Sequence, residues 1–390
     1  MRQWLRRSRL LRAVRFLPYS IPHGFWRLVA PVKANRVLFL SDSHRDFAGN
    51  MAYLRDALLT VDSGAEIIGV FKPRLASRRS LRDVLRLPYL IATSPVIVLD
   101  DFYPLIYRFR IRRGSRLVQL WHAAGAFKRV GHSRAGLPGG PTPGSEIHRN
   151  YTDAIVSSEE IRPDYAEAFG IALDRVHAWG MPRTDVFFDA ETVAATRARV
   201  RRELGVGEAE RFVVYAPTFR GNGQRSAEQA PAADWPGIAA ALGDGWRIGV
   251  RQHPFVAAEG VPDGTIDASV VGDMNDLLMA TDVLITDYSS AIFEFALLER
   301  PILFFVPDLQ EYTAARSFYR PFDHYSVGPV VSSDDELADA IRGAAVDPAR
   351  LVSFREEFCS ALDGRSSERI ARELLGVAVV ASDGPKEPVS

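Results

Sequence analysis

The segment Asp282-Val283-Leu284-Ile285-Thr286-Asp287-Tyr288-Ser289-Ser290 joins a short apolar run to a polar turn, and the helix-length stretch 291–298 follows it. A short β-branched and leucine-rich run bounded by turn residues is typical of a buried strand. The segment therefore predicts a strand, a tight turn and a helix in succession, which is the repeating unit of a parallel α/β sheet.

The same alternation extends in both directions from this segment and begins at Arg36. We predict strands at 36–41, 66–70, 96–99, 117–122, 154–157 and 176–179, and a second series at 212–216, 246–251, 283–286 and 302–306. Helices are expected at 51–59, 159–169, 276–280 and 290–298, and the tail from about 335 favours helices that pack back across the molecule. The pattern predicts an α/β protein with parallel sheets.

The length of 390 residues is more than one compact core usually organises, so two domains are expected. The charged, alanine-rich stretch 191–204 separates the two strand series and is predicted to be the connecting helix. We predict a basic segment at 1–34, a first Rossmann-like domain at 35–190 and a second at 205–380. Ligands of such sheets bind beyond the carboxyl ends of the strands, here in a cleft between the domains.

Composition excludes several classes of protein. Lys plus Arg equals Asp plus Glu at 48 each, which argues against a protein that coats nucleic acid. The single cysteine, Cys359, excludes an intrachain disulfide framework and multi-cysteine metal sites. Neither a G-x-x-x-x-G-K-[ST] loop nor a G-x-G-x-x-G motif after the first strand is present, so no nucleotide cofactor is expected. The pair Asp100-Asp101 lacks a third metal ligand nearby and is interpreted as solvated turn acids; no metal is expected.

The first 36 residues are strongly basic, with no acidic residue before Asp42. Nine cations occur there, at Arg2, Arg6, Arg7, Arg9, Arg12, Arg15, Arg27, Lys33 and Arg36, interspersed with Trp4, Leu5, Leu10, Leu11, Val14, Phe16 and Leu17. A helix of this kind can lie in an anionic membrane interface, whereas no run of about 20 apolar residues that could span a bilayer is present. A poorly ordered basic tail is the alternative.

Polar residues that end the predicted strands are the candidates for chemistry. His122 ends the apolar strand of Gln119-Leu120-Trp121-His122, where it could serve as a general base or only hydrogen-bond a loop carbonyl. Arg251 and His253 point to the same side of an extended chain and could bind one anion together, unless the arginine pairs with a surface acid.

Two further strand ends carry polar residues. Ser289 or Ser290 could bind a phosphate at the helix start or simply cap the helix. A fourth strand, Tyr215-Ala216-Pro217-Thr218-Phe219-Arg220, ends with a hydroxyl and a guanidinium at the same edge.

Taken in order, several segments resemble a known family, the CDP-glycerol glycerophosphotransferases, which are the primases and polymerases of teichoic acids and related polymers. The segments are the Trp121-His122 loop, Gly180-Met181-Pro182-Arg183-Thr184-Asp185, Tyr215-Ala216-Pro217-Thr218-Phe219-Arg220, Arg251-Gln252-His253-Pro254, Asp287-Tyr288-Ser289-Ser290-Ala291-Ile292-Phe293-Glu294 and Arg300-Pro301-Ile302-Leu303-Phe304-Phe305. The resemblance covers about 36–312, and several spaced motifs in one order are more specific than any one of them.

The resemblance implies a GT-B-type architecture, with two Rossmann-like domains facing a cleft, the donor held mainly by the second, and no metal or cofactor usually required. It implies catalytic roles for His122, as the base, and His253. It implies donor contacts for Leu120, Trp121, Ala123, Ala124, Arg183, Pro217, Thr218, Arg220, Arg251, Gln252, Asp287, Ser289, Ser290 and Glu294. Two positions depart from the family pattern: Ala123-Ala124-Gly125 replaces a Gly-Thr-Pro-like loop, and Glu294 stands where aspartate is frequent. The departures weaken the assignment of the polyol.

The implied activity is transfer of a polyol phosphate, with glycerol phosphate expected first, from CDP-glycerol or CDP-ribitol to a hydroxyl of a polyprenyl-diphosphate-linked acceptor, with release of CMP. The enzyme would act as a peripheral protein at the cytoplasmic face of the cell membrane, and no nucleic acid is expected as a partner. At 390 residues, one or a few transfers are slightly favoured over repeated polymerisation. The rival hypotheses are a GT-B glycosyltransferase that uses a nucleotide sugar and a non-catalytic phosphate-binding protein at the membrane surface.

Overall fold

The computed structural model describes residues 9–72, 79–142, 144–221, 227–254, 256 and 260–376, with the side chains at 9–13 and 15 excepted. The basic and apolar residues named above at positions 2–7 therefore lie outside the described residues, as do the side chains of Arg9, Leu10, Leu11, Arg12 and Arg15. All of the predicted strands fall within the described residues.

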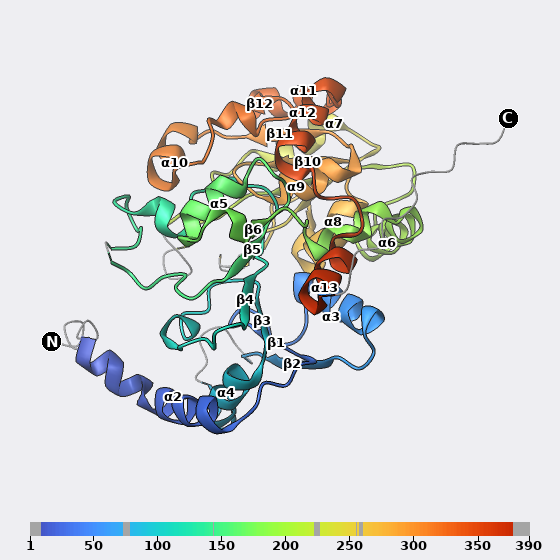
Figure 1. Cartoon of the computed structure of the whole chain (residues 1–390). Helices are drawn as coiled ribbons and strands as arrows, with labels where there is room; N and C mark the ends of the chain where they lie inside the picture. The colour runs from blue at the N-terminus through green and yellow to red at the C-terminus, as the bar shows by residue number, and fades with distance from the viewer. Residues whose placement is uncertain are drawn as a thin grey trace.

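Two parallel sheets form the framework of the molecule (Figure 1). Within the described residues, six strands make the first sheet in the order β2-β1-β3-β4-β5-β6 and six more make the second in the order β12-β11-β10-β7-β8-β9. The first sheet contains β1 (Arg36–Leu40), β2 (Glu66–Val70), β3 (Val96–Leu99), β4 (Arg116–Gln119), β5 (Asp153–Ile155) and β6 (Val176–His177). The second contains β7 (Arg211–Ala216), β8 (Trp246–Val250), β9 (Ile266–Asp267), β10 (Val283–Thr286), β11 (Ile302–Phe305) and β12 (Val330–Val331).

Helices connect and cover the strands. They are α2 (Arg9–Val29), α3 (Gly49–Val61), α4 (Leu81–Thr93), α5 (Arg162–Phe169), α6 (Ala190–Glu203), α7 (Trp235–Leu242), α8 (Met274–Ala280), α9 (Ala291–Phe295), α10 (Leu309–Arg316), α11 (Asp334–Arg342), α12 (Pro348–Cys359) and α13 (Ser366–Leu375). Short 3-10 helices lie at Ile106–Arg108, Gly131–Arg134, Leu173–Arg175, Pro182–Phe188, Ala268–Val270, Ala296–Leu298 and Phe322–His324.

The structure confirms the predicted α/β class and the two parallel sheets. The predicted strand 117–122 is wrong at its end, because β4 stops at Gln119 and Trp121 adopts a left-handed backbone with φ of 60°. The predicted helix 159–169 begins only at Arg162, where Pro163 suits the first turn. The two-residue strands β9 and β12 were not predicted, because so short a segment has no periodicity.

The connecting helix α6 agrees with the prediction for 191–204. Asp189 caps its start, since the Asp189 carboxylate accepts hydrogen bonds from the backbone N–H groups of Glu191 and Thr192. At the far end of the chain α13 returns to the first sheet and packs against α3, as Figure 1 shows. The two sheets are therefore joined by α6 and again by the C-terminal helices, while the domain boundaries given above remain a prediction.

The two halves of the molecule meet where the loop after β4 contacts α9. Gly125 has a φ of 64°, and a Cβ at this position would lie 2.3 Å from the ring of Phe293. Glycine is required there both for the backbone conformation and for the contact. The hydroxyl of Tyr325 donates to the carbonyl of Ala126 at 2.7 Å and extends the same seam. This packing places the end of β4 beside the start of α9.

Helix α2 lies at the periphery of the first sheet against α4 (Figure 1). On its inner face the rings of Phe16, Tyr19 and His23 pack edge to face around Phe109. Its exposed large apolar side chains are Leu17, Ile21, Phe25 and Leu28, and the neighbouring helix α4 exposes Leu81 and Leu85. We call this set the apolar face. Among the described helices none is long and apolar enough to cross a bilayer.

Candidate active site

A pocket of about 260 Å³ lies between the two sheets, at the carboxyl ends of β4, β7, β8 and β10. Nine residues predicted from the sequence line it: His122, Arg183, Pro217, Arg251, Gln252, His253, Ser289, Ser290 and Glu294. Ala216, Pro254, Met274, Asn275, Leu278 and Ala291 complete the lining. The pocket thus gathers residues from both halves, as expected for a site at the edges of two parallel sheets.

The backbone of Trp121 presents His122 to the pocket. The N–H of Trp121 donates to the side-chain oxygen of Gln119 at 2.9 Å, and Nδ2 of Asn50 donates to the Trp121 carbonyl at 2.8 Å. These bonds hold a left-handed conformation that is costly for a residue with a Cβ. As a result the chain turns sharply after β4, and the His122 ring is half exposed at the pocket.

Asp101 orients the imidazole of His122. Oδ1 of Asp101 lies 3.5 Å from Nδ1 of His122, and the Ser43 hydroxyl donates to Oδ2 of Asp101 at 2.7 Å. Burial favours the neutral acid, but the hydrogen bonds from His122, Ser43 and the Phe102 N–H outweigh burial and lower the pKa of Asp101. An ionised Asp101 beside Nδ1 leaves Nε2 of His122 as the nitrogen that can take a proton.

The interpretation of Asp100 and Asp101 as solvated turn acids is wrong. Asp100 is only 2% exposed, and its Oδ2 lies 2.8 Å from Nε2 of His44. This hydrogen bond raises the pKa of His44. The loop after β1 covers the end of β3 because the two strands are neighbours in the sheet, and no local sequence pattern gives that order.

Arg251 and His253 follow β8 and both line the pocket, as their spacing predicted. Nη1 of Arg251 donates to the carbonyl of Val271 at 2.5 Å, which fixes the guanidinium. Burial, together with the nearby charges of Lys128 and Arg251, lowers the pKa of His253 to about 4. His253 is therefore neutral at pH 7 in this state and can donate one hydrogen bond.

Ser289 and Ser290 form the turn between β10 and α9 and line the pocket. The Ser289 hydroxyl accepts a hydrogen bond from the Ala291 N–H at 3.2 Å, so Ser289 caps the turn. Ser290 occupies the N-cap position, but its side chain makes no capping hydrogen bond. The Ser290 hydroxyl, unlike that of Ser289, is therefore not used for capping and can bind a ligand in the pocket.

Arg183 connects the two halves at the rim of the pocket. Its guanidinium forms an ion pair with Glu294, which is only 1% exposed and whose Oε2 is buried without a hydrogen-bond partner among the described residues. Asn50 accepts from the Arg183 N–H at 3.1 Å, and Nδ2 of Asn275 donates to the Arg183 carbonyl at 2.8 Å. Asn50 and Asn275 were missed by sequence reasoning, since a single asparagine carries no functional pattern.

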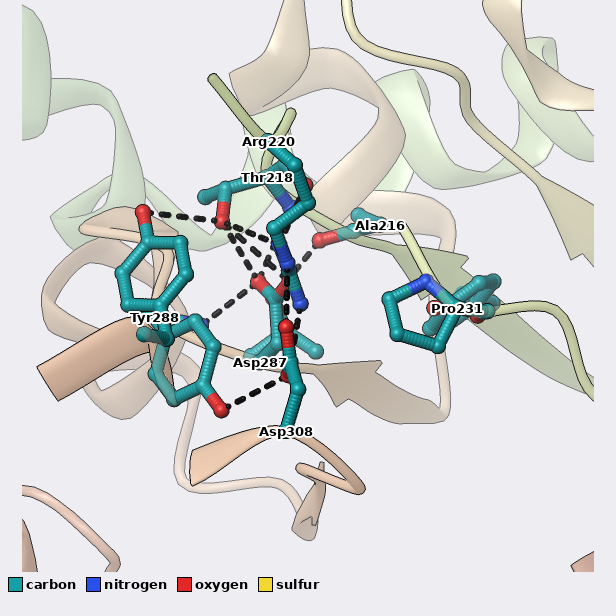
Figure 2. Close-up of polar contacts among 10 residues, drawn as sticks. Ala216, Thr218, Arg220, Pro231, Asp287, Tyr288 and Asp308 are labelled. Atoms are coloured by element: carbon teal, nitrogen blue, oxygen red, sulfur yellow. Dashed lines mark hydrogen bonds and ion pairs between the residues drawn. The ribbon is translucent and has the colours of Figure 1, made fainter. Parts of the chain in front are cut away.

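Three further predicted residues, Thr218, Arg220 and Asp287, lie in a closed network beside the pocket (Figure 2). Arg220 donates to Asp287 at 2.8 Å and to Asp308 at 2.6 Å. Its guanidinium also contacts the rings of Tyr288 and Tyr312, which stack on each other with their centroids 3.9 Å apart. The N–H and the hydroxyl of Thr218 both donate to Asp287. The network fixes the loop after β7 and the turn after β10 against each other.

The remaining predicted residues lie behind His122. The side chains of Leu120, Trp121 and Ala124 are buried, Ala123 is partly buried, and none of the four lines the pocket. The Trp121 ring packs 4.4 Å from the His122 ring and supports it. Direct donor contacts remain predictions for every residue named from the sequence, whether it lines the pocket, lies behind His122 or belongs to the network. Among the described residues no group of three or more His, Cys, Asp or Glu side chains is placed to hold a metal ion.

The chain matches the family model of CDP-glycerol:poly(glycerophosphate) glycerophosphotransferases over residues 24–376. It belongs to this family. The family resemblance inferred from the motifs is therefore confirmed. The match to the glycerophosphotransferase model is longer than the range 36–312 that the motifs covered, at both ends.

Relatives of this chain are named as teichoic acid polymerases and primases. The teichoic acid poly(ribitol-phosphate) polymerase of Bacillus spizizenii is 39% identical over 94% of the chain and 60% of the relative, and the ribitol-phosphate polymerase TarK of Staphylococcus aureus is 40% identical over 88% and 69%. Relatives named for glycerol phosphate are 25% to 32% identical. The chain spans about 60% of the length of the Bacillus spizizenii poly(ribitol-phosphate) polymerase.

The solved structure of a teichoic acid polymerase shares the fold of this chain. The wall teichoic acid polymerase TagF superimposes with a TM-score of 0.73 over 94% of this chain and 96% of that one, at 20% identity. A TagF variant was also solved after a soak with CDPG. The likeness confirms the GT-B-type architecture of this glycerophosphotransferase-family protein.

Proposed function

We propose that the protein transfers a polyol phosphate from a CDP-polyol to a hydroxyl of a lipid-linked acceptor and releases CMP. The observation that carries this proposal is that one pocket combines a half-exposed, carboxylate-paired His122 with Arg251, His253 and Ser290. A base on one side of a pocket and anion-binding groups on the other suit an in-line attack on a phosphorus atom. Membership of the glycerophosphotransferase family supports the choice of donor.

The reaction follows from the orientation of His122. Nε2 of His122 takes the proton of the acceptor hydroxyl as its oxygen attacks the distal phosphorus of the donor, and the bond between that phosphorus and the CMP oxygen breaks. Asp101 stabilises the imidazolium that forms, because its ionised carboxylate lies beside Nδ1. No covalent enzyme intermediate is needed.

Arg251 and its neighbours would stabilise the negative charge that develops on the leaving group. The guanidinium is held by the carbonyls of Val271 and Gly272, and so is positioned before a ligand arrives. An anion beside His253 would raise its pKa from about 4 and allow it to share this charge.

Replacing Arg251 with alanine should weaken CDP-polyol binding about 10- to 100-fold, because hydrogen bonds to charged groups contribute about 1.5 to 3 kcal/mol. Isothermal titration calorimetry with the donor measures the change directly. Arg202→Ala, an exposed site on α6 outside the pocket, is the control and should bind normally. Unchanged affinity in Arg251→Ala would contradict the assigned role.

We propose ribitol phosphate as the transferred group, although the sequence alone favoured glycerol phosphate. The support is the higher identity to relatives named for ribitol phosphate, 35% to 40%, than to those named for glycerol phosphate. Parallel incubations with CDP-ribitol, CDP-glycerol and a UDP-sugar, with the released nucleotide separated by chromatography, test both choices. CMP should form fastest from CDP-ribitol; preference for CDP-glycerol overturns the polyol, and UDP release overturns the donor class.

The proposal includes peripheral association with the cytoplasmic face of the cell membrane, where a polyprenyl-diphosphate-linked acceptor would be carried. The apolar face supports it, because Leu17, Ile21, Phe25 and Leu28 follow one another at helical spacing on α2 and remain exposed. Such a stripe is suited to shallow burial among lipid headgroups.

Ile21→Glu combined with Phe25→Glu should release the protein from vesicles into solution, because two charges would have to enter the apolar layer of the interface. Vesicle sedimentation measures the bound fraction. Val352→Glu replaces a similarly exposed apolar side chain on α12 and should leave binding unchanged. Retained binding by the double variant would mean that another surface anchors the protein.

A further inference from the structure

An arginine-lined groove lies on the opposite edge of the first sheet from the pocket. It has a volume of about 710 Å³ and is formed by residues 108–115, which precede β4, and 149–152, which precede β5. Five of its lining residues are arginines and none is acidic: Arg108, Arg110, Arg112, Arg113 and Arg149. The groove therefore carries an excess of positive charge.

The sequence of the segment accounts for this concentration of charge. In Arg108-Phe109-Arg110-Ile111-Arg112 the apolar residues alternate with arginines. The 3-10 helix ends at Arg108 and the chain is extended at Phe109, and successive residues of an extended chain point to opposite sides. Phe109 is buried against Phe16, Tyr19 and His23 of α2, and Ile111 also packs against the core. The apolar side chains anchor the segment, and Arg110 and Arg113 remain exposed.

The arginines of the groove differ in their partners. Arg112 is structural, since it donates to the carbonyls of Ala92, Arg27 and Ala30 and ties the end of α2 to the end of α4. Arg108 and Arg149 share one acid, Glu146, at 3.8 and 3.1 Å.

Two cations of the groove are uncompensated. Arg110 and Arg113 are exposed and have no hydrogen bond or ion pair among the described residues. Burial and the nearby charges of Arg110 and Arg112 lower the pKa of Arg27 at the end of α2, which shows that like charges crowd this corner. A bound anion would relieve the repulsion, and a guanidinium fork matches the geometry of a phosphate.

The position of the groove identifies its ligand. It borders α2, because Arg112 of the groove donates to the carbonyls of Arg27 and Ala30 at the end of that helix. If the exposed apolar side chains of α2 lie in the membrane as proposed above, the groove is brought close to the lipid headgroups. The pocket with His122 lies at the other end of β4. This four-residue strand is about 13 Å long, so the groove is no part of the reaction centre. We propose that this groove binds the phosphate headgroups of anionic phospholipids, an inference that rests on the membrane association proposed above.

The test compares full-length wild type with Arg110→Gln combined with Arg113→Gln on two kinds of vesicle. One is phosphatidylcholine alone and the other is phosphatidylcholine mixed with phosphatidylglycerol. Each neutralised arginine near an anionic surface costs about 1 kcal/mol of binding, so partitioning to the anionic vesicles should fall about 30-fold. Partitioning to neutral vesicles and transfer to a soluble acceptor analogue should not change. Arg202→Gln with Arg211→Gln, both exposed in the second half of the chain, is the matched control.

Other outcomes overturn the inference and separate it from the membrane proposal. Wild type that binds both vesicles equally would refute the groove while leaving the apolar face intact, and wild type that binds neither would refute both. Unchanged anionic binding by the double variant also refutes the groove. If the variant keeps its vesicle binding but loses affinity for inorganic phosphate or a soluble polyol-phosphate chain, the groove binds free phosphates or the polymer instead of lipid.

Discussion

Replacing His122 with alanine should lower the rate of polyol-phosphate transfer by about 100- to 10,000-fold, the usual contribution of a positioned general base. The donor should still bind nearly normally, because the anion-binding residues Arg251, His253 and Ser290 come from the other half of the pocket. Single-turnover measurement of CMP release, together with calorimetric titration of the CDP-polyol, separates the chemical step from binding. A loss confined to the rate places His122 at the reacting hydroxyl.

The control for this experiment is His324→Ala, which removes a half-exposed histidine paired with Glu357 outside the pocket. It should transfer at the wild-type rate. Full activity in His122→Ala would remove the base from the proposed reaction. A variant that transfers slowly only because it binds donor poorly would instead make His122 a binding residue.

Asp287→Ala should destabilise the protein by about 3 to 5 kcal/mol, the usual effect of removing one partner from a buried ion pair. Asp287 is 1% exposed and accepts hydrogen bonds from the N–H groups of Thr218 and Tyr288 as well as from Arg220 (Figure 2). Its loss leaves two buried N–H groups unsatisfied and Arg220 with Asp308 as its one remaining carboxylate. The shift of the urea unfolding midpoint measures the effect.

The matched control is Asp335→Ala, which removes an exposed aspartate with no ion pair among the described residues. Its effect should stay within about 0.5 kcal/mol. If Asp287→Ala instead unfolds at the wild-type midpoint and loses donor affinity, Asp287 contacts the donor directly, as the family resemblance implied. The two results distinguish a supporting network from a binding site.

Much of the pocket could be predicted from the sequence because parallel sheets carry the residues at their strand ends to one edge. His122, Arg251 and Ser290 each follow a short apolar run, and the structure brings all three into one pocket. The i and i+2 spacing of Arg251 and His253 correctly placed both on the same side. These inferences needed only local periodicity and the rule for ligand sites in α/β sheets.

The supporting residues could not be predicted because they depend on which strands are neighbours. Asp101 reaches His122 since β3 pairs with β4, and His44 reaches Asp100 since β1 pairs with β3. Asn50 and Asn275 bind backbone groups of distant loops. The low pKa of His253 likewise comes from burial and from Lys128 in the other half of the chain, neither of which its own motif reveals.

The central claim is that the pocket transfers an intact polyol phosphate, and mass spectrometry of the acceptor product tests it most directly. A lipid-linked disaccharide is incubated with wild-type protein and CDP-ribitol, and the mass gain is compared with the CMP released. We predict gains in whole units of ribitol phosphate, with one CMP for each unit added. An acceptor that gains no mass from any CDP-polyol, or gains a hexose from a UDP-sugar with release of UDP, would contradict the account.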